Sequence, residues 1–238
     1  MRSVRRKSAA WATALPVAVV LTGCVSTQEI AARTRLVNAR VLASQTTTTV
    51  ARPDPNVTVG RLTLIHGRTG TAIVVPLRNT SSSALTDLPI TVGVHARGGR
   101  ALHLNSSANL DYFNTHVAAI APHAVTTWVF TTNRRLAAAA PFASVGSPQL
   151  HPSVGSALPR IEASSHGAAR LSVTNASAIP QYDLPVYVVA VRGGRDVAAG
   201  RATVAHLGTH GTTTLSVSVL GSPRGATLDV IATPTIFS

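Results

Sequence analysis

Asp87-Leu88-Pro89-Ile90-Thr91-Val92-Gly93-Val94 contains the pattern that most directly indicates the fold, and its first residues are repeated later in the chain as Asp183-Leu184-Pro185-Val186. From Leu88 to Val94 every second residue is aliphatic. This period-two alternation is typical of a strand with one buried face. A proline near the start of a strand removes no hydrogen bond from the interior of the ladder. The stretch therefore predicts antiparallel β-structure.

The segments around this stretch are duplicated. Arg78-Asn79-Thr80-Ser81 is matched by Thr174-Asn175-Ala176-Ser177, and this pair and the Asp-Leu-Pro pair share a separation of 96 residues. Arg97-Gly98-Gly99-Arg100 recurs 95 residues later as Arg192-Gly193-Gly194-Arg195. A separation kept across several segments predicts two copies of one module.

The turns between the alternating segments indicate the kind of module. Gly-Gly between strand-like flanks predicts a two-residue hairpin, because such turns need positive φ angles. About seven short strands per copy, with a turn every 8–12 residues, predict an immunoglobulin-like β-sandwich. The cysteine pair of that fold is absent, since Cys24 is the chain's only cysteine. We therefore expect an all-β protein with two tandem Ig-like antiparallel sandwiches, at residues 57–150 and 151–238.

Residues 1–23 have the layout of an export signal, in which a basic stretch (Arg2, Arg5, Arg6 and Lys7) precedes an apolar run. The run, from Ala9 to Leu21, contains Pro16 and is shorter than the roughly 20 residues of a membrane span. Leu21-Thr22-Gly23-Cys24 resembles the lipobox of bacterial lipoproteins. The resemblance implies cleavage before Cys24, a diacylglycerol and acyl chains such as palmitate on Cys24, and anchoring to the outer face of the bacterial cytoplasmic membrane.

Residues 24–56 predict a stalk. Ser26-Thr27-Gln28-Glu29 fits a helix capping box. Residues 28–43 contain neither glycine nor proline and predict a short helix, with an extended segment as the alternative. The threonines 46–49 and Arg52-Pro53-Asp54-Pro55 then predict a linker.

The cationic charge that remains after removal of the signal is all arginine, because Lys7 is the only lysine. Loss of the four basic residues of the signal lowers the formal charge from +13 to +9. Outside the membrane such charge suits anionic headgroups or wall polymers, not nucleic acid, while simple solubility is the alternative. A composition rich in alanine and arginine with a single lysine is typical of a high-GC bacterium such as an actinomycete.

The order of motifs in each copy is similar to that of FxLYD and CARDB-like modules, which occur in tandem on bacterial surface lipoproteins. The order is a strand ending in Asn-x-Ser, a strand beginning with Asp-Leu-Pro, a Gly-Gly hairpin and a late Thr-rich strand, over residues 57–148 and 156–234. Tyr182-Asp183-Leu184 is the nearest trace of the aromatic FxLYD signature, and the first copy has Thr86 in place of the tyrosine. The resemblance implies binding or spacing, and not catalysis.

The first copy contains an insertion that is a candidate binding loop. Val129 aligns with Leu215 and Pro148 with Pro234 at a separation of 86, so nine extra residues lie between Arg100 and Val117. The excess falls within residues 104–115. Loops on a rigid sandwich often carry binding function, and the candidate residues here are Asn109, Asp111, Tyr112 and Phe113. The alternative is that the two aromatic side chains cover the edge of the sandwich.

The Arg-Gly-Gly-Arg tips are candidate anion sites. Across a two-residue turn Arg97 would oppose Arg100, and Arg192 would oppose Arg195. Like charges directly opposite each other repel, and a bound anion would relieve that repulsion. The alternative is that the guanidinium groups extend separately into water, where repulsion is screened.

Complete catalytic and metal-binding motifs are absent from the sequence. It contains neither Gly-x-Ser-x-Gly nor His-Glu-x-x-His. His206 and His210 are separated by Gly208, which disfavours a helical ligand pair, and a two-residue turn would place His95 and His103 on opposite faces of their hairpin.

We therefore expect no cofactor and no metal. The sequence favours a non-enzymatic binding or assembly component of the cell envelope, with the membrane and an envelope protein or wall polymer as partners. Two alternatives are an envelope hydrolase, or accessory subunit, with a site between the modules, and a histidine-based metal carrier.

Overall fold

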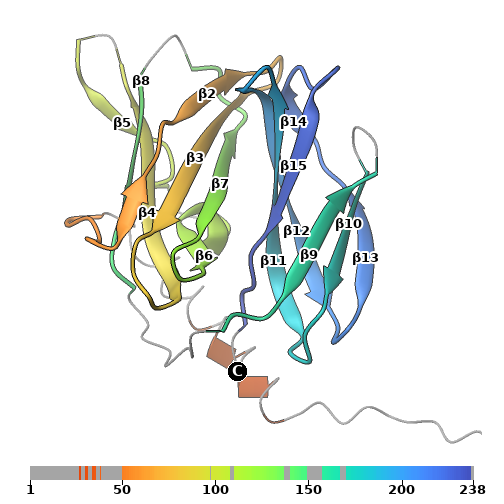
Figure 1. Cartoon of the computed structure of the whole chain (residues 1–238). Coiled ribbons are helices and arrows are strands. Elements are labelled where there is room, and N and C mark those ends of the chain that lie inside the picture. Colours follow the sequence, from red (N-terminus) through yellow and green to blue (C-terminus); the bar gives the residue numbers. More distant parts are fainter. Residues whose placement is uncertain are drawn as a thin grey trace, which may run out of the picture.

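A computed structural model of the chain describes residues 50–96, 98–107, 110–136, 140–148, 157–166 and 170–236, together with Thr27, Ile30, Ala31, Thr34, Arg35 and Asn38. From residue 50 onward the described regular structure is strand, apart from the short 3-10 helix η1 (Tyr112–Asn114). The all-β prediction is confirmed (Figure 1).

The first sandwich holds β1 to β8. One sheet has β3 at its centre, with β1 and β2 along one edge and β7 along the other. The other sheet has β4 at its centre, with β8 on one side and β5 and β6 following each other on the other side. The strands are β1 (Val57–Val59), β2 (Thr63–His66), β3 (Thr71–Asn79), β4 (Leu85–His95), β5 (Ala101–His103), β6 (His116–Ile120), β7 (Val125–Thr132) and β8 (Ala140–Val145).

The second sandwich holds β9 to β15. Its sheets have the orders β13-β10-β9 and β14-β12-β11-β15, and every pairing is antiparallel. The strands are β9 (Ile161–Ser165), β10 (Arg170–Asn175), β11 (Gln181–Arg192), β12 (Arg195–Leu207), β13 (Thr212–Ser216), β14 (Val219–Gly221) and β15 (Thr227–Ala232).

The internal repeat is confirmed strand by strand, and the predicted insertion lies between β5 and β6. Leu88 of β4 pairs with Val117, and Leu184 of β11 pairs with Val204. The two copies are therefore 96 residues apart before the insertion, from Leu88 to Leu184, and 87 residues apart after it, from Val117 to Val204. The insertion is nine residues long, as predicted. β12 is one continuous strand where the first module has β5 and β6.

The register of the late strands differs by one residue from the sequence alignment. Trp128 pairs with Val75, and Leu215 pairs with Leu171, which is the repeat partner of Val75. Leu215 therefore corresponds to Trp128 and not to Val129. The alignment slipped because Trp128, Val129 and Phe130 are all buried, so alternation alone does not fix which of them faces the core of the sandwich.

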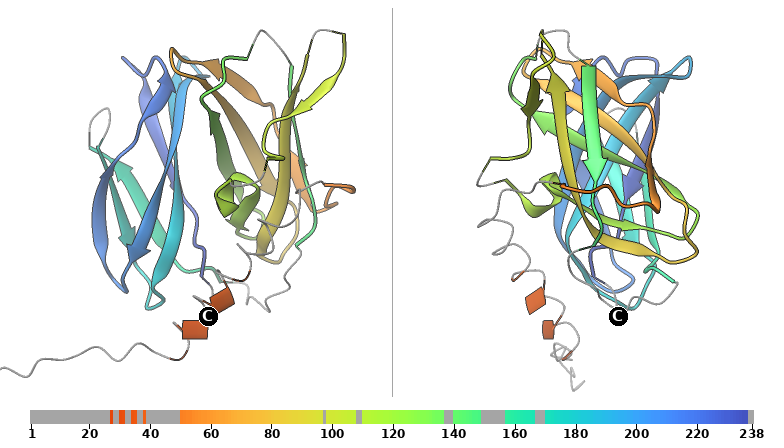
Figure 2. Two further views of the ribbon diagram at one scale, coloured as in Figure 1. Left: turned by 180° about the vertical axis from the view of Figure 1, so that it is seen from behind. Right: turned by 90° about the vertical axis from the view of Figure 1, so that its left-hand side faces the viewer.

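The two sandwiches lie side by side and form four stacked sheets (Figures 1 and 2). In β11, Val186 and Val188 belong to the core of the second sandwich, whereas Tyr187 and Val189 belong to the apolar core that contains the first. The sequence predicts strands with one buried face, but the inner sheets are buried on both faces. From Pro185 to Val191 the odd-numbered residues of β11 are apolar as well, which is typical of strands inside a stack.

The two stacked sandwiches together form the head of the protein. The described residues from Thr27 to Asn38 are helical and lie at the same end of the head as the carboxyl terminus (Figure 1). The Thr34 hydroxyl donates a hydrogen bond of 2.8 Å to the Ile30 carbonyl, as in a helical turn. Within the described part of the chain, no helix combines the length and the apolar character needed to cross a bilayer. Cys24 and the rest of residues 1–26 lie outside the described residues.

Candidate functional site

The insertion begins beside Asn105, whose side chain is hydrogen-bonded to β4. The Asn105 side chain is 1% exposed. Its Nδ2 donates to the Ile90 carbonyl at 2.7 Å, and its Oδ1 accepts from the Val92 amide at 2.9 Å. The amide group thus takes the place of a strand backbone beside β4, so the sheet stays hydrogen-bonded while the chain departs and returns.

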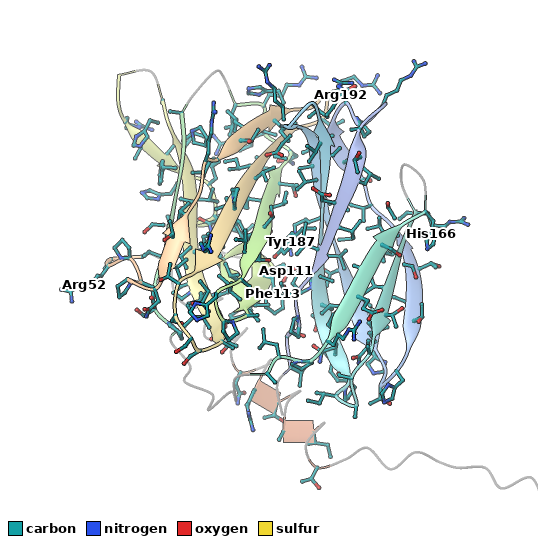
Figure 3. All side chains as sticks on the ribbon, viewed as in Figure 1. Arg52, Asp111, Phe113, His166, Tyr187 and Arg192 are labelled. Carbon is teal, nitrogen blue, oxygen red and sulfur yellow. The ribbon has the colours of Figure 1, made fainter. Side chains whose placement is uncertain are left out.

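Tyr112 and Phe113 are buried where the two modules meet. Figure 3 shows Phe113 between the modules. They form a small apolar cluster with Ala118 and Ile236 and are 6% and 2% exposed. The Phe113 carbonyl accepts a hydrogen bond of 3.1 Å from Trp128 Nε1. Both aromatic side chains therefore pack inside the protein, as in the alternative in which they cover the edge of the sandwich, and neither is accessible to a partner. Asn109 lies outside the described residues.

Asp111 and Asn114 join the insertion to the second module through Arg201. One guanidinium nitrogen of Arg201 donates to Asn114 Oδ1, and the other donates to Asp111 Oδ2 at 3.1 Å. The Asp111 side chain remains 36% exposed, while that of Arg201 is 9% exposed. Asp111 therefore links the insertion to the second module through Arg201.

Tyr187 is the buried neighbour of this ion pair, since it pairs with Arg201 across β11 and β12. Burial raises the pKa of the Tyr187 phenol above its ordinary value; Arg201 opposes this shift and Asp111 adds to it. The hydroxyl has no hydrogen-bond partner among the described residues. Neither Tyr187 nor Arg201 was a sequence candidate, although an uninterrupted apolar run around Tyr187 signals a strand with two buried faces.

The two glycine tips differ in length. In the second module Arg192 pairs with Arg195 across Gly193 and Gly194, whose φ angles are 56° and 71°, so the predicted two-residue turn is present. In the first module the Ala96 amide donates to the Arg100 carbonyl at 2.9 Å, which leaves a three-residue loop. Arg100 therefore faces Ala96, and not Arg97 as predicted. Arg97 itself lies outside the described residues.

The three-residue loop also changes the positions of two histidines. Gly93 pairs with His103, and His95 pairs with Ala101, so both imidazoles lie on one face of the hairpin. They contact the Phe142 ring from two sides, with centroid distances of 4.8 Å for His95 and 5.3 Å for His103. The prediction of opposite faces is wrong because it assumed a two-residue turn. The described residues contain no group of three or more His, Cys, Asp or Glu side chains arranged to hold a metal ion.

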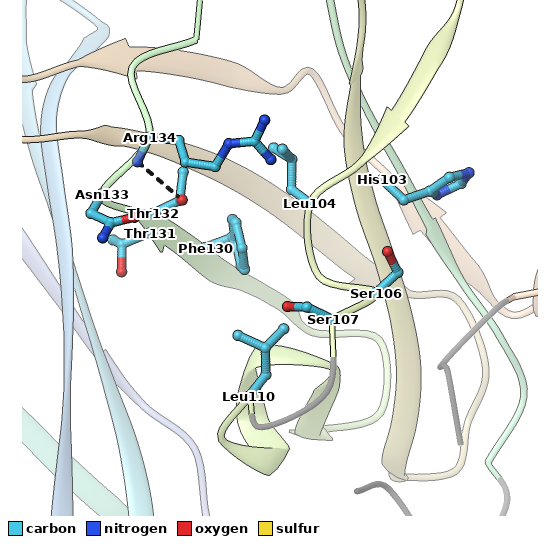
Figure 4. Close-up of a pocket in the computed structure, with 10 residues that line it drawn as sticks. All are labelled: His103, Leu104, Ser106, Ser107, Leu110, Phe130, Thr131, Thr132, Asn133 and Arg134. Carbon is cyan, nitrogen blue, oxygen red and sulfur yellow. Dashed lines mark hydrogen bonds between the residues drawn. The ribbon is translucent and has the colours of Figure 1, made fainter. Parts of the chain in front are cut away.

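A pocket of about 410 Å³ lies beside the first half of the insertion (Figure 4). One wall comes from the chain leaving β5, and the other comes from the end of β7 and the residues after it. Its lining combines hydroxyl, amide, imidazole and guanidinium groups with three apolar side chains, from His103, Leu104, Ser106, Ser107, Leu110, Phe130, Thr131, Thr132, Asn133 and Arg134. Such a lining suits a polar ligand.

No protein-family model matches the sequence. No curated protein matches it either. Among solved structures, a segment of two fibronectin type III domains from chicken tenascin aligns with 74% of this chain and 91% of its own length, at 15% identity and a TM-score of 0.20. The description of each module as an Ig-like sandwich rests on the strand orders and registers given above.

Proposed function

We propose that this chain is an exported bacterial lipoprotein of the cell envelope, in which a lipid on Cys24 holds a non-enzymatic head that binds or assembles a partner. The packed joint between the modules supports the non-enzymatic part of this proposal. Tyr187, Val189 and Ala199 of the second module pack into the core of the first, so side chains fill the space where a hydrolase would need a cleft. The likeness of the motif order to FxLYD and CARDB-like modules supports the same role.

The anchor follows from the lipobox-like Leu21-Thr22-Gly23-Cys24. Each buried methylene of an acyl chain contributes about 0.8 kcal/mol, so two or more chains hold a protein durably at a membrane. The wild-type chain should incorporate labelled palmitate and partition into a detergent phase, and the Cys24→Ala chain should do neither. A wild-type chain that stays in the aqueous phase with a free thiol would contradict the anchor.

The partner of the head is an envelope protein or a wall polymer, and the pocket beside residues 103–110 is one place to contact it. Deleting the whole insertion would also remove the Asp111–Arg201 ion pair, so a bulky substitution in the pocket is the more specific test. Ser107→Trp should reduce capture of the partner from solubilised membranes. Thr58→Trp, on an exposed position of β1, is the matched control. Equal capture by both variants would exclude the pocket.

A further inference from the structure

Four loops that contain arginines or are flanked by them lie at one end of the two stacked sandwiches, opposite the described helical residues (Figures 1 and 2). The loops follow β2, β7, β11 and β14, and these strands all end there (Figure 1). Figure 3 shows Arg192 at this end. Six exposed arginines belong to the group, which we name the arginine face: Arg68, Arg134, Arg135, Arg192, Arg195 and Arg224.

Contacts across the module boundary bring the two halves of the arginine face together. Gly67, next to Arg68, lies so close to Leu220 that a Cβ there would stand 2.8 Å from Leu220 Cδ2. Gly221 has φ +103°, and a Cβ there would stand 2.7 Å from Ile65 Cγ2. The β2–β3 loop of the first module and β14 of the second are therefore in direct contact. The arginines of the two modules therefore belong to loops and strand ends that adjoin across the module boundary.

Two of the guanidinium groups are held by backbone carbonyls. Arg135 donates to the Arg68 carbonyl from two of its nitrogens, with the Nε bond at 2.8 Å. Arg192 Nη1 donates to the Arg224 carbonyl at 2.9 Å. A guanidinium has five N–H donors, so each group keeps donors for a ligand while its position is restrained. This restraint lowers the entropy that binding would otherwise cost.

The arginine face has little negative charge to compensate it. Within the described part of the chain, no carboxylate lies within ion-pair distance of its six guanidinium groups, and the pairs Arg160–Glu162 and Arg201–Asp111 lie elsewhere. The nearby Asp196 accepts a hydrogen bond of 2.8 Å from the Thr63 hydroxyl across the module boundary. Clustered like charge of this kind raises the local concentration of an oppositely charged ligand.

We infer that the arginine face binds a linear polymer whose negative charges are phosphodiester groups. A guanidinium matches phosphate through paired N–H···O bonds. A chain of regularly spaced charges can contact both modules at once, as one small anion cannot. The inference deepens the proposed function and takes from it only the orientation: with Cys24 anchored, the face points away from the membrane, towards polymers outside it.

The test measures binding of end-labelled, lipid-free poly(glycerol phosphate) to the full chain in neutral detergent, between about 50 and 200 mM salt. Six contacts predict a slope of about −4 for the logarithm of the binding constant against that of the salt concentration. The variant Arg68→Gln/Arg195→Gln removes one guanidinium from each module; neither side chain makes a hydrogen bond among the described residues. Its slope should fall to about −3, with roughly tenfold weaker binding at the lowest salt.

The matched control is Arg52→Gln/Arg78→Gln, which removes the same charge from exposed positions elsewhere. Equal weakening by this control would overturn the inference, because binding would then follow net charge. Tighter binding of the Cys24→Ala chain to poly-L-glutamate or to phosphatidylglycerol vesicles would overturn it too, as would no binding to the polymer. The wild-type chain separates the proposals: if it binds the polymer but does not partition into the detergent phase, the arginine face stands and only the anchor is refuted.

Discussion

At the scale of single residues, the repeated Asn-x-Ser motif has a structural role in both modules. Asn79 and Asn175 are both fully buried. Their Nδ2 atoms donate to the carbonyls of Ser83 at 2.7 Å and Ile179 at 2.8 Å, respectively, and their Oδ1 atoms accept from the amides of Ser81 and Ser177. Further bonds reach the turn before β7 in one module and before β13 in the other. Each asparagine thereby ties together two turns at the same end of its sandwich.

Asn79→Ala should lower the free energy of unfolding by about 2–4 kcal/mol, because it leaves several buried backbone groups without partners. Urea unfolding followed by circular dichroism measures the change. Asn56→Ala, at an exposed position, should stay within about 0.5 kcal/mol of the wild type. A similar small change for Asn79→Ala would show that the turns hold without the side chain.

At the scale of elements, the end of the insertion buries a histidine at the start of β6. His116 opens β6 and is 3% exposed. Its ring stacks on Tyr112 with a centroid distance of 4.1 Å, and its Nδ1 lies 2.9 Å from the Thr115 hydroxyl. Burial lowers the pKa of His116 from 6.5 to about 4. The folded chain therefore keeps this imidazole neutral at a pH where the unfolded chain protonates it.

The contribution of His116 to the free energy of unfolding is fully present above pH 6.5, where the imidazole is neutral in the folded and the unfolded chain. It is lost as the pH falls towards the folded pKa of about 4. A shift of this size corresponds to about 3 kcal/mol. Between about pH 7 and about pH 4.5, the wild type should lose about 2–3 kcal/mol more unfolding free energy than His116→Gln. Urea titrations of both proteins give the difference. Parallel pH profiles would mean that His116 titrates normally in the folded chain.

At the scale of the whole molecule, the two modules behave as one body because alternate residues of β11 serve different cores. Val188 packs within the second sandwich, and Val189, 4% exposed, packs towards the first. In β15, Val230 and Ile231 divide in the same way. The joint is therefore an apolar sheet-on-sheet contact, closed at its side by the insertion.

Val189→Glu should separate the modules without removing a side chain from the core of the second sandwich. Burying the carboxylate would cost about 3–5 kcal/mol, which the protein avoids by opening the joint. We expect a larger radius of gyration in solution scattering and two unfolding transitions in place of one. Thr203→Glu, at an exposed position of β12, should change neither. An unchanged radius for Val189→Glu would show that the joint does not depend on this contact.

Much of each module could be predicted from the sequence, since local patterns specify local structure. Alternation from Leu88 to Val94 indicated β4, and Gly193-Gly194 indicated the tight hairpin because both residues adopt positive φ angles. The repeat revealed that a second sandwich exists, and the break in its spacing located the insertion. Positive φ angles recur at Asp87 and Asp183, and aspartate tolerates this conformation better than most residues.

Local patterns thus specify two sandwiches without a disulfide and the place where they differ, because strand period, turn residues and repeat spacing act over short stretches of chain. What covers each face of the strands depends on the packing of the folded chain. In the folded chain Tyr112 and Phe113 are buried. The chain leaves the β13 sheet after Ser216 and pairs with the edge of β12 as β14. Arginines of both modules lie at one end of the protein. These outcomes depend on contacts between segments far apart in the chain, and an apolar residue fits any complementary apolar surface, so no local pattern selects its partner.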